Sequence, residues 1–203
     1  FTAVDRAEEE ISQAFLVNAE APAAMAQAIA AGHGSMLQLS TDFVFSGGQS
    51  VPYTVESPVQ PLSVYGSSKA EGEQAVLNLL APSGRGYVMR TSWLYGLHGH
   101  NFFRTMLRLH RERSISSSPL RVVADQIGCP TAVDSLARAC WRLIQQSWQL
   151  HDLDRELEPI HHWCDAGVAS WYDFAVSIGE YCVEAGWLDQ AAQVQPIPAS
   201  QYP

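Results

Sequence analysis

The chain has 203 residues, of which 47% are hydrophobic, and its 12 basic and 21 acidic side chains give a formal net charge of −9. This composition is ordinary for a globular protein, and the acidic balance argues against nucleic-acid binding because few cations are available to neutralise phosphates. No apolar run approaches the roughly 20 residues that span a bilayer, and the first residues do not form a signal peptide, so we expect a cytoplasmic protein without membrane contact.

The first part of the chain is predicted to form helices followed by a buried strand. Residues 5–32 have helical periodicity, with acidic residues in the first turn and Gly32 as a natural stop. Residues 35–40 form a short apolar run with the length of a buried strand. Glycines and prolines between residues 47 and 61 then predict a long irregular connection, of the kind that usually has a function.

The rest of the chain alternates between predicted helices and strands. A helical pattern over 62–80 precedes a strand over 87–93. Further helices are predicted at 101–113, 134–148 and 170–185, and short strands near 120–123, 160–164 and 193–197. This alternation indicates an α/β fold with a mostly parallel sheet covered by helices.

The start of the chain is unusual for such a fold. It opens directly in a helix-forming segment, with no strand and no glycine-rich turn before it. The predicted strands are also few for a sheet flanked by so many helices, since parallel sheets need covered faces and paired edges. We therefore expect the 203 residues to be part of a longer protein.

One pair of residues suggests acid–base chemistry. The single lysine of the chain, Lys69, follows Tyr65 by four positions, so both side chains lie on one face of the predicted helix. A cation near a phenol stabilises the phenolate and can lower its pKa by roughly 1–3 units, which allows the tyrosine to act as a general acid toward a carbonyl oxygen. The alternative is an unrelated pair of helix residues.

Two further candidates stand where predicted strands end. Ligands of open α/β sheets bind at the carboxyl ends of the strands. Thr41 follows the first strand, where its hydroxyl can assist at the same carbonyl oxygen as Tyr65; the alternative is a capped turn. Trp93 ends the next strand and can stack on a flat ring, although from the residues alone a core aromatic is the favoured interpretation.

These segments together resemble a known family. Ser40–Phe45 (STDFVF), Tyr65–Lys69 (YGSSK) and Arg90–Gly96 (RTSWLYG) occur in the order and spacing of the extended short-chain dehydrogenases/reductases. The chain is more closely similar to the dTDP-4-dehydrorhamnose reductase family. Further segments that fit this family are TAVD at 2–5, NAEAP at 18–22, NFFRTML at 101–107, DQIGCPT at 125–131 and SWYDFA at 170–175.

The resemblance implies reduction, by NADPH or NADH, of the 4-keto group of dTDP-4-dehydro-6-deoxy-L-mannose to dTDP-L-rhamnose. It implies that Tyr65 donates the proton, that Lys69 binds the nicotinamide ribose and tunes Tyr65, and that Thr41 assists at the keto oxygen. Thr2 is implied as a further cofactor contact. The implied substrate contacts are Val4, Phe43, Trp93, Gln126, Pro130 and Thr131, with Phe43 standing where the family usually has tyrosine.

The resemblance also implies the fold and its division. We expect a Rossmann-like doubly wound parallel sheet, with a partial dinucleotide-binding domain at 1–123. The remainder, 124–203, is expected to be a mainly substrate-binding part that is interleaved with the sheet and truncated at its C-terminus. The family's first strands and its G-x-x-G-x-x-G turn, which holds the cofactor pyrophosphate, are not in this sequence. We therefore expect the 203 residues alone to bind dinucleotide poorly, and the choice between NADPH and NADH stays open.

One acidic residue bears on a possible metal site and on assembly. Asp134 falls near a position that binds Mg²⁺ at the dimer interface of some family members, which leaves a homodimer open; we favour Asp134 as the N-cap of a helix that begins at Ser135, and assign no metal.

One alternative function is a nucleotide-sugar epimerase or dehydratase that holds NAD tightly. Another is a non-catalytic regulatory homologue. Consumption of added NADPH separates the first alternative from a reductase.

Overall fold

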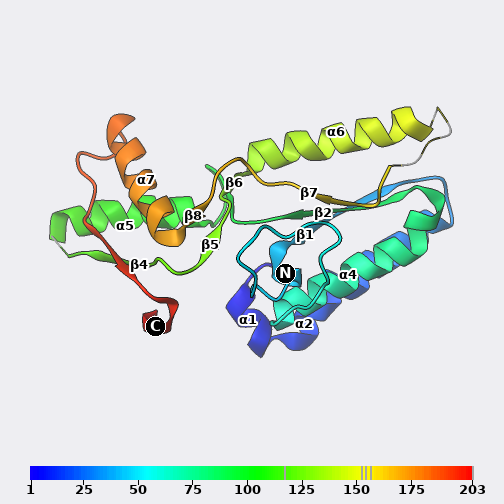
Figure 1. The fold of residues 1–203 in the computed structure, drawn as a ribbon, viewed down its shortest axis with the longest axis horizontal. Coiled ribbons are helices and arrows are strands. Elements are labelled where there is room, and N and C mark those ends of the chain that lie inside the picture. The colour runs from blue at the N-terminus through cyan, green and yellow to red at the C-terminus, as the bar shows by residue number, and fades with distance from the viewer. Residues whose placement is uncertain (117, 152, 154, 156, 203) are drawn as a thin grey trace. The chain divides into compact units, whose positions relative to one another are not determined.

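The computed structural model describes residues 1–116, 118–151, 153, 155 and 157–202. Its contacts divide the chain into two compact units, each of which is described by itself (Figure 1). Unit 1 comprises residues 1–91 and 137–163, and unit 2 comprises residues 92–136 and 164–203. These units are defined by contacts, whereas the division expected at residue 123 was defined by the ligand that each part binds. The assignment of cofactor binding to one part and substrate binding to the other stays a prediction.

Unit 1 begins with four consecutive helical segments. They are α1 (Val4–Glu9), α2 (Ile11–Phe15), the π-helical turn η1 (Leu16–Glu20) and α3 (Ala21–Ala30). The helical region predicted over 5–32 is thus confirmed, but it is interrupted at Glu10, whose φ of −111° and ψ of 47° depart from helical values. The π-helical turn is a rare local structure that is frequent at functional sites.

The sheet of unit 1 is parallel, with strand order β1–β2–β7. Its strands are β1 (Met36–Thr41), β2 (Gly86–Thr91) and β7 (Ile160–His162). The helix α4 (Val64–Leu80) connects β1 to β2 and packs against both strands and against α3, which buries Val76 and Leu80 completely. The short segments η2 (Asp42–Val44) and η3 (Ala81–Ser83) follow β1 and α4. The α/β class with a parallel sheet is confirmed.

Unit 2 has its own hydrophobic core between two helices and a pair of strands. The elements are α5 (Phe102–Ser116), α7 (Trp171–Glu184) and the parallel pair β4 (Leu120–Val123) and β9 (Val194–Ile197), followed by η4 (Ala199–Gln201). The core includes Met106, Leu120, Val122, Ile178 and Leu188.

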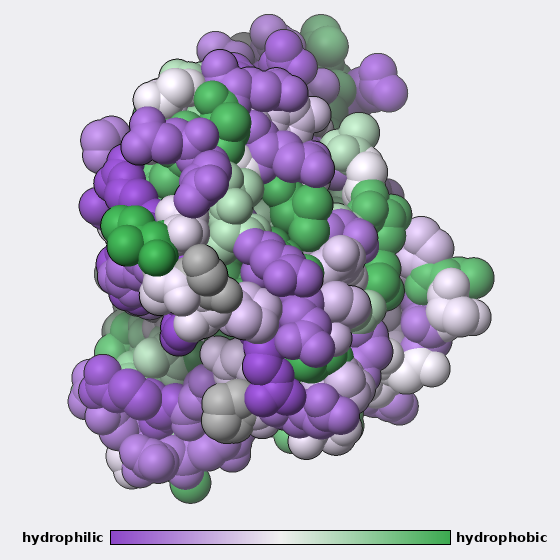
Figure 2. All heavy atoms as spheres, turned by 90° about the vertical axis from the view of Figure 1, so that its left-hand side faces the viewer, coloured by the Kyte–Doolittle hydropathy of each residue, from purple (hydrophilic) through white to green (hydrophobic). Residues whose placement is uncertain are grey.

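Hydrophilic residues cover most of the face drawn in Figure 2, where the hydrophobic residues form small separate groups.

Unit 2 also contains four strands of two residues each. β3 (Leu94–Tyr95) pairs in parallel with β6 (Thr131–Ala132), and β5 (Ile127–Gly128) pairs antiparallel with β8 (Ala169–Ser170). These strands are too short to produce an alternating pattern, so the sequence did not predict them. They nevertheless bring the segments around residues 93, 128 and 171 together.

The helix α6 (Val133–His151) corrects the expected role of Asp134. The helix begins two residues earlier than predicted, so Asp134 lies in its first turn and is not the N-cap of a helix starting at Ser135. A carboxylate in the first turn still interacts favourably with the helix dipole. Within the described residues, no helix combines the length and the apolar character that crossing a membrane requires.

Candidate active site

Thr41 occupies the carboxyl end of β1, where the strand turns into η2. Its Oγ1 accepts a hydrogen bond from the Phe43 backbone N–H at 3.2 Å and donates one to Asp42 Oδ1 at 3.1 Å. The turn predicted as the alternative role of Thr41 is therefore present. The same hydroxyl also lies near enough to Tyr65 to lower the pKa of its phenol, so the capping role leaves open the role expected for Thr41 beside Tyr65.

Tyr65 is held at the first turn of α4. The Ser63 hydroxyl caps this helix by accepting from the Gly66 N–H at 3.0 Å. A Cβ on Gly66 would come within 2.2 Å of the Phe43 carbonyl oxygen, so only glycine allows the η2 turn to approach α4 this closely. The Phe43 ring meets the Tyr65 ring edge to face, with centroids 5.6 Å apart. The close approach therefore aligns Tyr65 with Thr41 and Phe43.

The environment of Tyr65 keeps its phenol protonated. Burial raises the pKa of Tyr65 most strongly; the nearby Thr41 hydroxyl opposes this shift, and the charge of Asp42 adds to it. Burial also raises the pKa of the Asp42 carboxyl. The sequence predicted the opposite direction for Tyr65, a pKa lowered by Lys69. That prediction is wrong for this structure because burial dominates.

Lys69 lies one helical turn after Tyr65, as predicted, and its ammonium is bound to the sheet. Its Nζ donates a hydrogen bond of 2.6 Å to the Leu39 carbonyl oxygen on β1. Burial lowers the pKa of Lys69, and the charge of Glu73 opposes this shift. The ammonium is thereby fixed near the carboxyl end of β1, and it retains two further N–H donors for a ligand.

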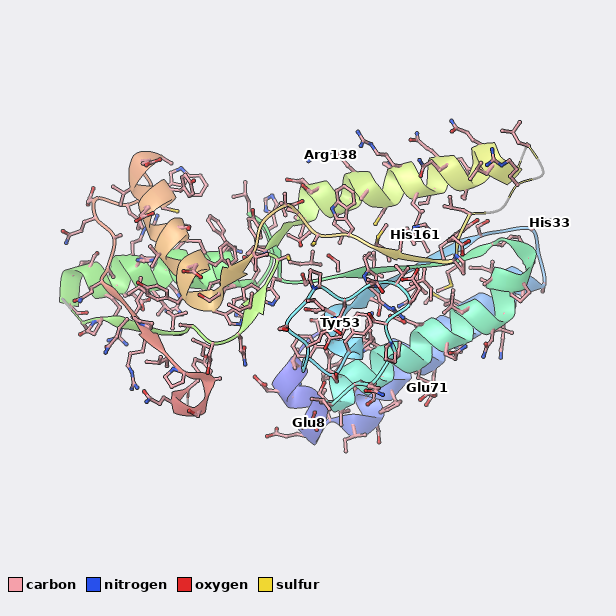
Figure 3. All side chains as sticks on the ribbon, in the orientation of Figure 1. Glu8, His33, Tyr53, Glu71, Arg138 and His161 are labelled. Atoms are coloured by element: carbon pink, nitrogen blue, oxygen red, sulfur yellow. The ribbon has the colours of Figure 1, made fainter. Side chains whose placement is uncertain are left out.

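Three other residues of unit 1 were expected to contact the cofactor or the substrate. One of them, Phe43, lies beside Tyr65, and 42% of its surface is exposed. Thr2 is exposed and Val4 half-buried, at the start of α1. α1 is joined to the start of α4 by Glu8, which lies on α1 (Figure 3) and whose Oε1 accepts from the Val64 N–H at 2.8 Å. The structure thus brings Thr41, Phe43, Tyr65 and Lys69 together. The cofactor and substrate contacts expected of Thr2 and Val4 stay predictions.

Sequence reasoning assigned no role to a buried asparagine behind this site. Asn18 lies in η1, is only 4% exposed, and donates from Nδ2 to the Ser68 hydroxyl at 3.1 Å. Ser68 in turn donates to the Tyr65 carbonyl oxygen at 2.9 Å. The signal available in the sequence was a lone Asn inside an otherwise apolar helical stretch, because a buried amide needs a hydrogen-bond partner.

The remaining expected site residues lie in unit 2 around Trp93. The indole of Trp93 stacks on that of Trp171, with ring centroids 3.4 Å apart and planes 6° from parallel. Gln126 is exposed, and its Oε1 accepts from the Trp171 Nε1–H at 3.2 Å. Pro130 is half-buried. Thr131 is fully buried and donates its hydroxyl hydrogen to the Cys129 carbonyl oxygen at 3.0 Å. The substrate contact expected for it stays a prediction.

Within the described residues, no group of three or more His, Cys, Asp or Glu side chains is arranged to hold a metal ion. The donors near Tyr65 are a threonine hydroxyl, the phenol and an ammonium. These groups suit a carbonyl and a ribose hydroxyl, because they offer hydrogen-bond donors to neutral oxygens.

Comparison with known proteins gives one family over the whole chain. The family model described as the RmlD substrate binding domain matches residues 1–203. A dTDP-4-dehydrorhamnose reductase of Aggregatibacter actinomycetemcomitans is 39% identical over 203 residues, which are 100% of this chain and 66% of that protein. A probable dTDP-4,6-dihydroxy-2-methyloxan-3-one 4-ketoreductase of Streptomyces antibioticus is 41% identical over 180 residues, covering 88% of this chain and 56% of that protein.

A solved structure agrees with these sequence relatives. The crystal structure of dTDP-4-dehydrorhamnose reductase from Bacillus anthracis str. Ames in complex with NADP has a TM-score of 0.85 and 34% identity, and the match covers 99% of this chain and 64% of that one. The Rossmann-like class expected from the resemblance is thereby confirmed. The chain spans at most 66% of the length of these relatives.

Proposed function

The chain belongs to the RmlD substrate binding domain family, and from this membership we propose that the protein containing it reduces the 4-keto group of dTDP-4-dehydro-6-deoxy-L-mannose to dTDP-L-rhamnose. The observation that carries the proposal is the meeting of Thr41, at the carboxyl end of β1, with Tyr65, whose pKa the Thr41 hydroxyl lowers against the effect of burial. Two hydroxyl groups that meet at this edge of a parallel sheet are suited to receive one carbonyl oxygen.

Tyr65 is the proton donor in this proposal. Its raised pKa keeps the phenol protonated at neutral pH, and reduction of a ketone requires a proton at the oxygen as the carbon accepts a hydride. The Thr41 hydroxyl holds the same oxygen and orients the phenol. Phe43 packs against the Tyr65 ring and limits its rotation. The proton thus passes from the Tyr65 oxygen to the former keto oxygen.

Lys69 is the cofactor contact in this proposal. Its ammonium is held by the Leu39 carbonyl oxygen and has donors left for the hydroxyls of a nicotinamide ribose. NADPH, when bound, supplies the hydride for the reduction. The cofactor is named on the NADP complex of the Bacillus anthracis relative, and Thr2, at the start of α1, is a second contact by the resemblance.

Two other functions use the same residues differently. An epimerase or dehydratase would retain Tyr65 and Lys69 but would hold NAD tightly and consume no added reductant. A regulatory homologue would not need the set of Thr41, Tyr65 and Lys69. The reductase is favoured because the most similar relatives described above are named as reductases and a ketoreductase.

The test is NADPH oxidation by the complete protein that contains this chain, in the presence of the dTDP-linked keto-sugar. Tyr65→Phe should lower kcat by roughly 100- to 10,000-fold, because a positioned proton donor contributes about that factor, while NADPH binding should be retained. Tyr181→Phe is the matched control, since Tyr181 is 69% exposed on α7. Equal turnover in the unmodified protein and in Tyr65→Phe would contradict the proposal.

A further inference from the structure

An aromatic pair in unit 2 has a geometry that the proposed reaction does not itself explain. Trp93 is the one residue other than glycine, within the described part of the chain, whose backbone has a positive φ, at 46°. This left-handed conformation is unfavourable for a bulky residue, and it persists only where the surroundings enforce it. Strained residues of this kind cluster at ligand-binding sites.

Several contacts fix Trp93 in this conformation. Its carbonyl oxygen accepts a hydrogen bond from the Thr131 N–H at 3.1 Å, next to the β3–β6 pairing. The preceding hydroxyl, Ser92 Oγ, donates to the Cys129 carbonyl oxygen at 3.0 Å. The buried hydroxyl of Thr131 donates to that same oxygen. The segment 126–131 is therefore hydrogen-bonded both to Ser92, which precedes the strained residue, and to Trp93 itself.

The indole of Trp93 is fixed by two further residues. Trp171 stacks on it face to face at 3.4 Å. Gly128 lies so close that a Cβ there would be 2.4 Å from the Trp93 ring, which only the absence of a side chain allows. The β5–β8 pairing, with Gly128 opposite Ala169, brings these two contacts to the same ring.

Trp171 is itself held on several sides. It is the first residue of α7, whose start is fixed by a capping box in which Ser170 and Asp173 bond each other's backbone N–H. Its Nε1–H is bound to Gln126, and its ring packs against Phe102 with centroids 4.7 Å apart. A residue held in this way has little rotational freedom left and can act as a rigid support.

We propose that Trp171 and Gly128 are positioning residues that hold the half-buried Trp93 indole in one orientation, in which the part of its surface left free by both residues packs against the sugar of a nucleotide-linked substrate. The inference rests on the proposed function for the identity of that sugar. The fixed orientation of Trp93 rests only on the contacts given above. Gln126 then acts through Trp171 rather than on the substrate.

The kinetic test uses Trp171→Ala, Trp171→Phe and Gly128→Ala in the complete protein. Trp171→Ala and Gly128→Ala should raise KM for the keto-sugar about three- to tenfold, the range expected from loss of one aromatic stack, with kcat and KM for NADPH nearly unchanged. Trp171→Phe should restore most of the difference because a ring remains. Trp141→Ala is the control, since Trp141 is 62% exposed on α6.

A second measurement does not depend on turnover. In protein with ¹⁵N-labelled tryptophan, the ¹H–¹⁵N heteronuclear NOE of the Trp93 indole should have the value of a rigid group in the unmodified protein and in Trp171→Phe. It should fall in Trp171→Ala. Titration with dTDP-L-rhamnose should then shift the Trp93 signal more than that of Trp141.

The outcomes separate this inference from the proposed function. A rigid Trp93 indole in Trp171→Ala, or an unchanged KM where Trp93→Ala raises it, would overturn the positioning role. A lower KM in Trp171→Ala would also overturn it, because Trp171 would then block the sugar. If the unmodified protein does not oxidise NADPH with the keto-sugar, the proposed function fails, and the heteronuclear NOE alone decides whether Trp171 positions Trp93.

Discussion

The protonation state of Tyr65 decides the pH range in which it can donate a proton. Burial and the charge of Asp42 both raise its pKa, and the Thr41 hydroxyl only partly opposes them. A proton donor is active below its pKa and inactive above it. Turnover should therefore persist through neutral pH and decline only in the alkaline range, above the ordinary pKa of a tyrosine.

Asp42→Asn should move that decline to lower pH. Without the carboxylate charge beside it, the Tyr65 phenolate becomes easier to form, so the pKa of Tyr65 falls and the alkaline limb of the kcat profile follows it. Glu71→Gln is the control, because Glu71 lies exposed on the same helix (Figure 3). A limb that moves to higher pH in Asp42→Asn, or moves equally in both variants, would contradict this account.

The sequence singled out these residues as candidates, but it did not place their atoms. Helical spacing placed Tyr65 and Lys69 on one face, because positions i and i+4 are neighbours on any α-helix. It did not reveal that Lys69 bonds the Leu39 carbonyl oxygen, since the two residues are 30 positions apart and meet only when α4 packs on β1. The direction of the Tyr65 pKa shift was missed for the same reason, because burial is a property of the packed structure.

At the scale of elements, one buried ion pair contributes to the attachment of α4 to the sheet. Arg90 on β2 makes a bidentate contact with Glu73 on α4, with N–O distances of 2.6 to 3.1 Å, and both side chains are at most 4% exposed. A buried pair of this kind contributes little over a hydrophobic pair, but removal of one partner leaves a charge without compensation. The pair therefore makes the position of α4 sensitive to either partner.

Glu73→Gln should lower the free energy of unfolding by about 3–5 kcal/mol, because the guanidinium of Arg90 stays buried without its counter-charge. Urea denaturation of the complete protein measures this loss. In the exposed pair of Arg108 and Glu112, Glu112→Gln should cost at most about 1 kcal/mol, as is usual for surface pairs. Similar losses in the two variants would show that the buried pair does not hold α4.

The junction between α4 and η2 makes a separate prediction. Gly66→Ala would place a Cβ 2.2 Å from the Phe43 carbonyl oxygen, so the turn that carries Thr41 must move away from Tyr65. A displacement of about 1 Å in a catalytic group can cost roughly 100-fold in rate, so kcat should fall by roughly 10- to 100-fold. Ser67→Ala, one position further along α4, is the control. Unchanged kcat in Gly66→Ala would exclude the need for this close approach.

The helices and longer strands could be predicted because their periodicity extends over several residues. The helices at 62–80 and 170–185 and the strand at 120–123 were predicted within about two residues of their observed ends. The four strands of two residues could not be, because their pairing partners lie between about 35 and 45 positions away in the sequence. The start of α6 was placed late because Asp134 is equally suited to an N-cap and to a first turn.

At the scale of the whole molecule, the sequence predicted a second part interleaved with the sheet, but not the places where the chain passes between the two cores. The chain leaves unit 1 after Thr91, returns at Ala137 and leaves again after Trp163. Composition gives no sign of these crossings, because each falls inside or next to a regular element. Ala26, Val76 and Leu80 form a core in unit 1, whereas Met106, Ile178 and Leu188 belong to the core of unit 2.

His110 joins three segments of the second core. It is fully buried on α5; its Nδ1 accepts from the Ala192 N–H at 3.2 Å, and its Nε2 lies 2.9 Å from the Ala175 carbonyl oxygen on α7. Because Nδ1 accepts, the proton of the neutral ring must be on Nε2, which then donates to Ala175. The side chain therefore links α5, α7 and the segment before β9.

His110→Leu should loosen unit 2 and leave unit 1 unchanged. Leucine fills a similar volume but leaves the buried Ala192 N–H without its acceptor, at a cost of roughly 2 kcal/mol. Hydrogen exchange of amides in α5, α7, β4 and β9 should then accelerate about 30-fold, because 1.4 kcal/mol corresponds to tenfold, while exchange in β1 and β2 stays constant. His98→Leu, at an exposed position before α5, should alter neither. Equal acceleration in both units would mean that the two cores open together and that the chain unfolds as one cooperative body.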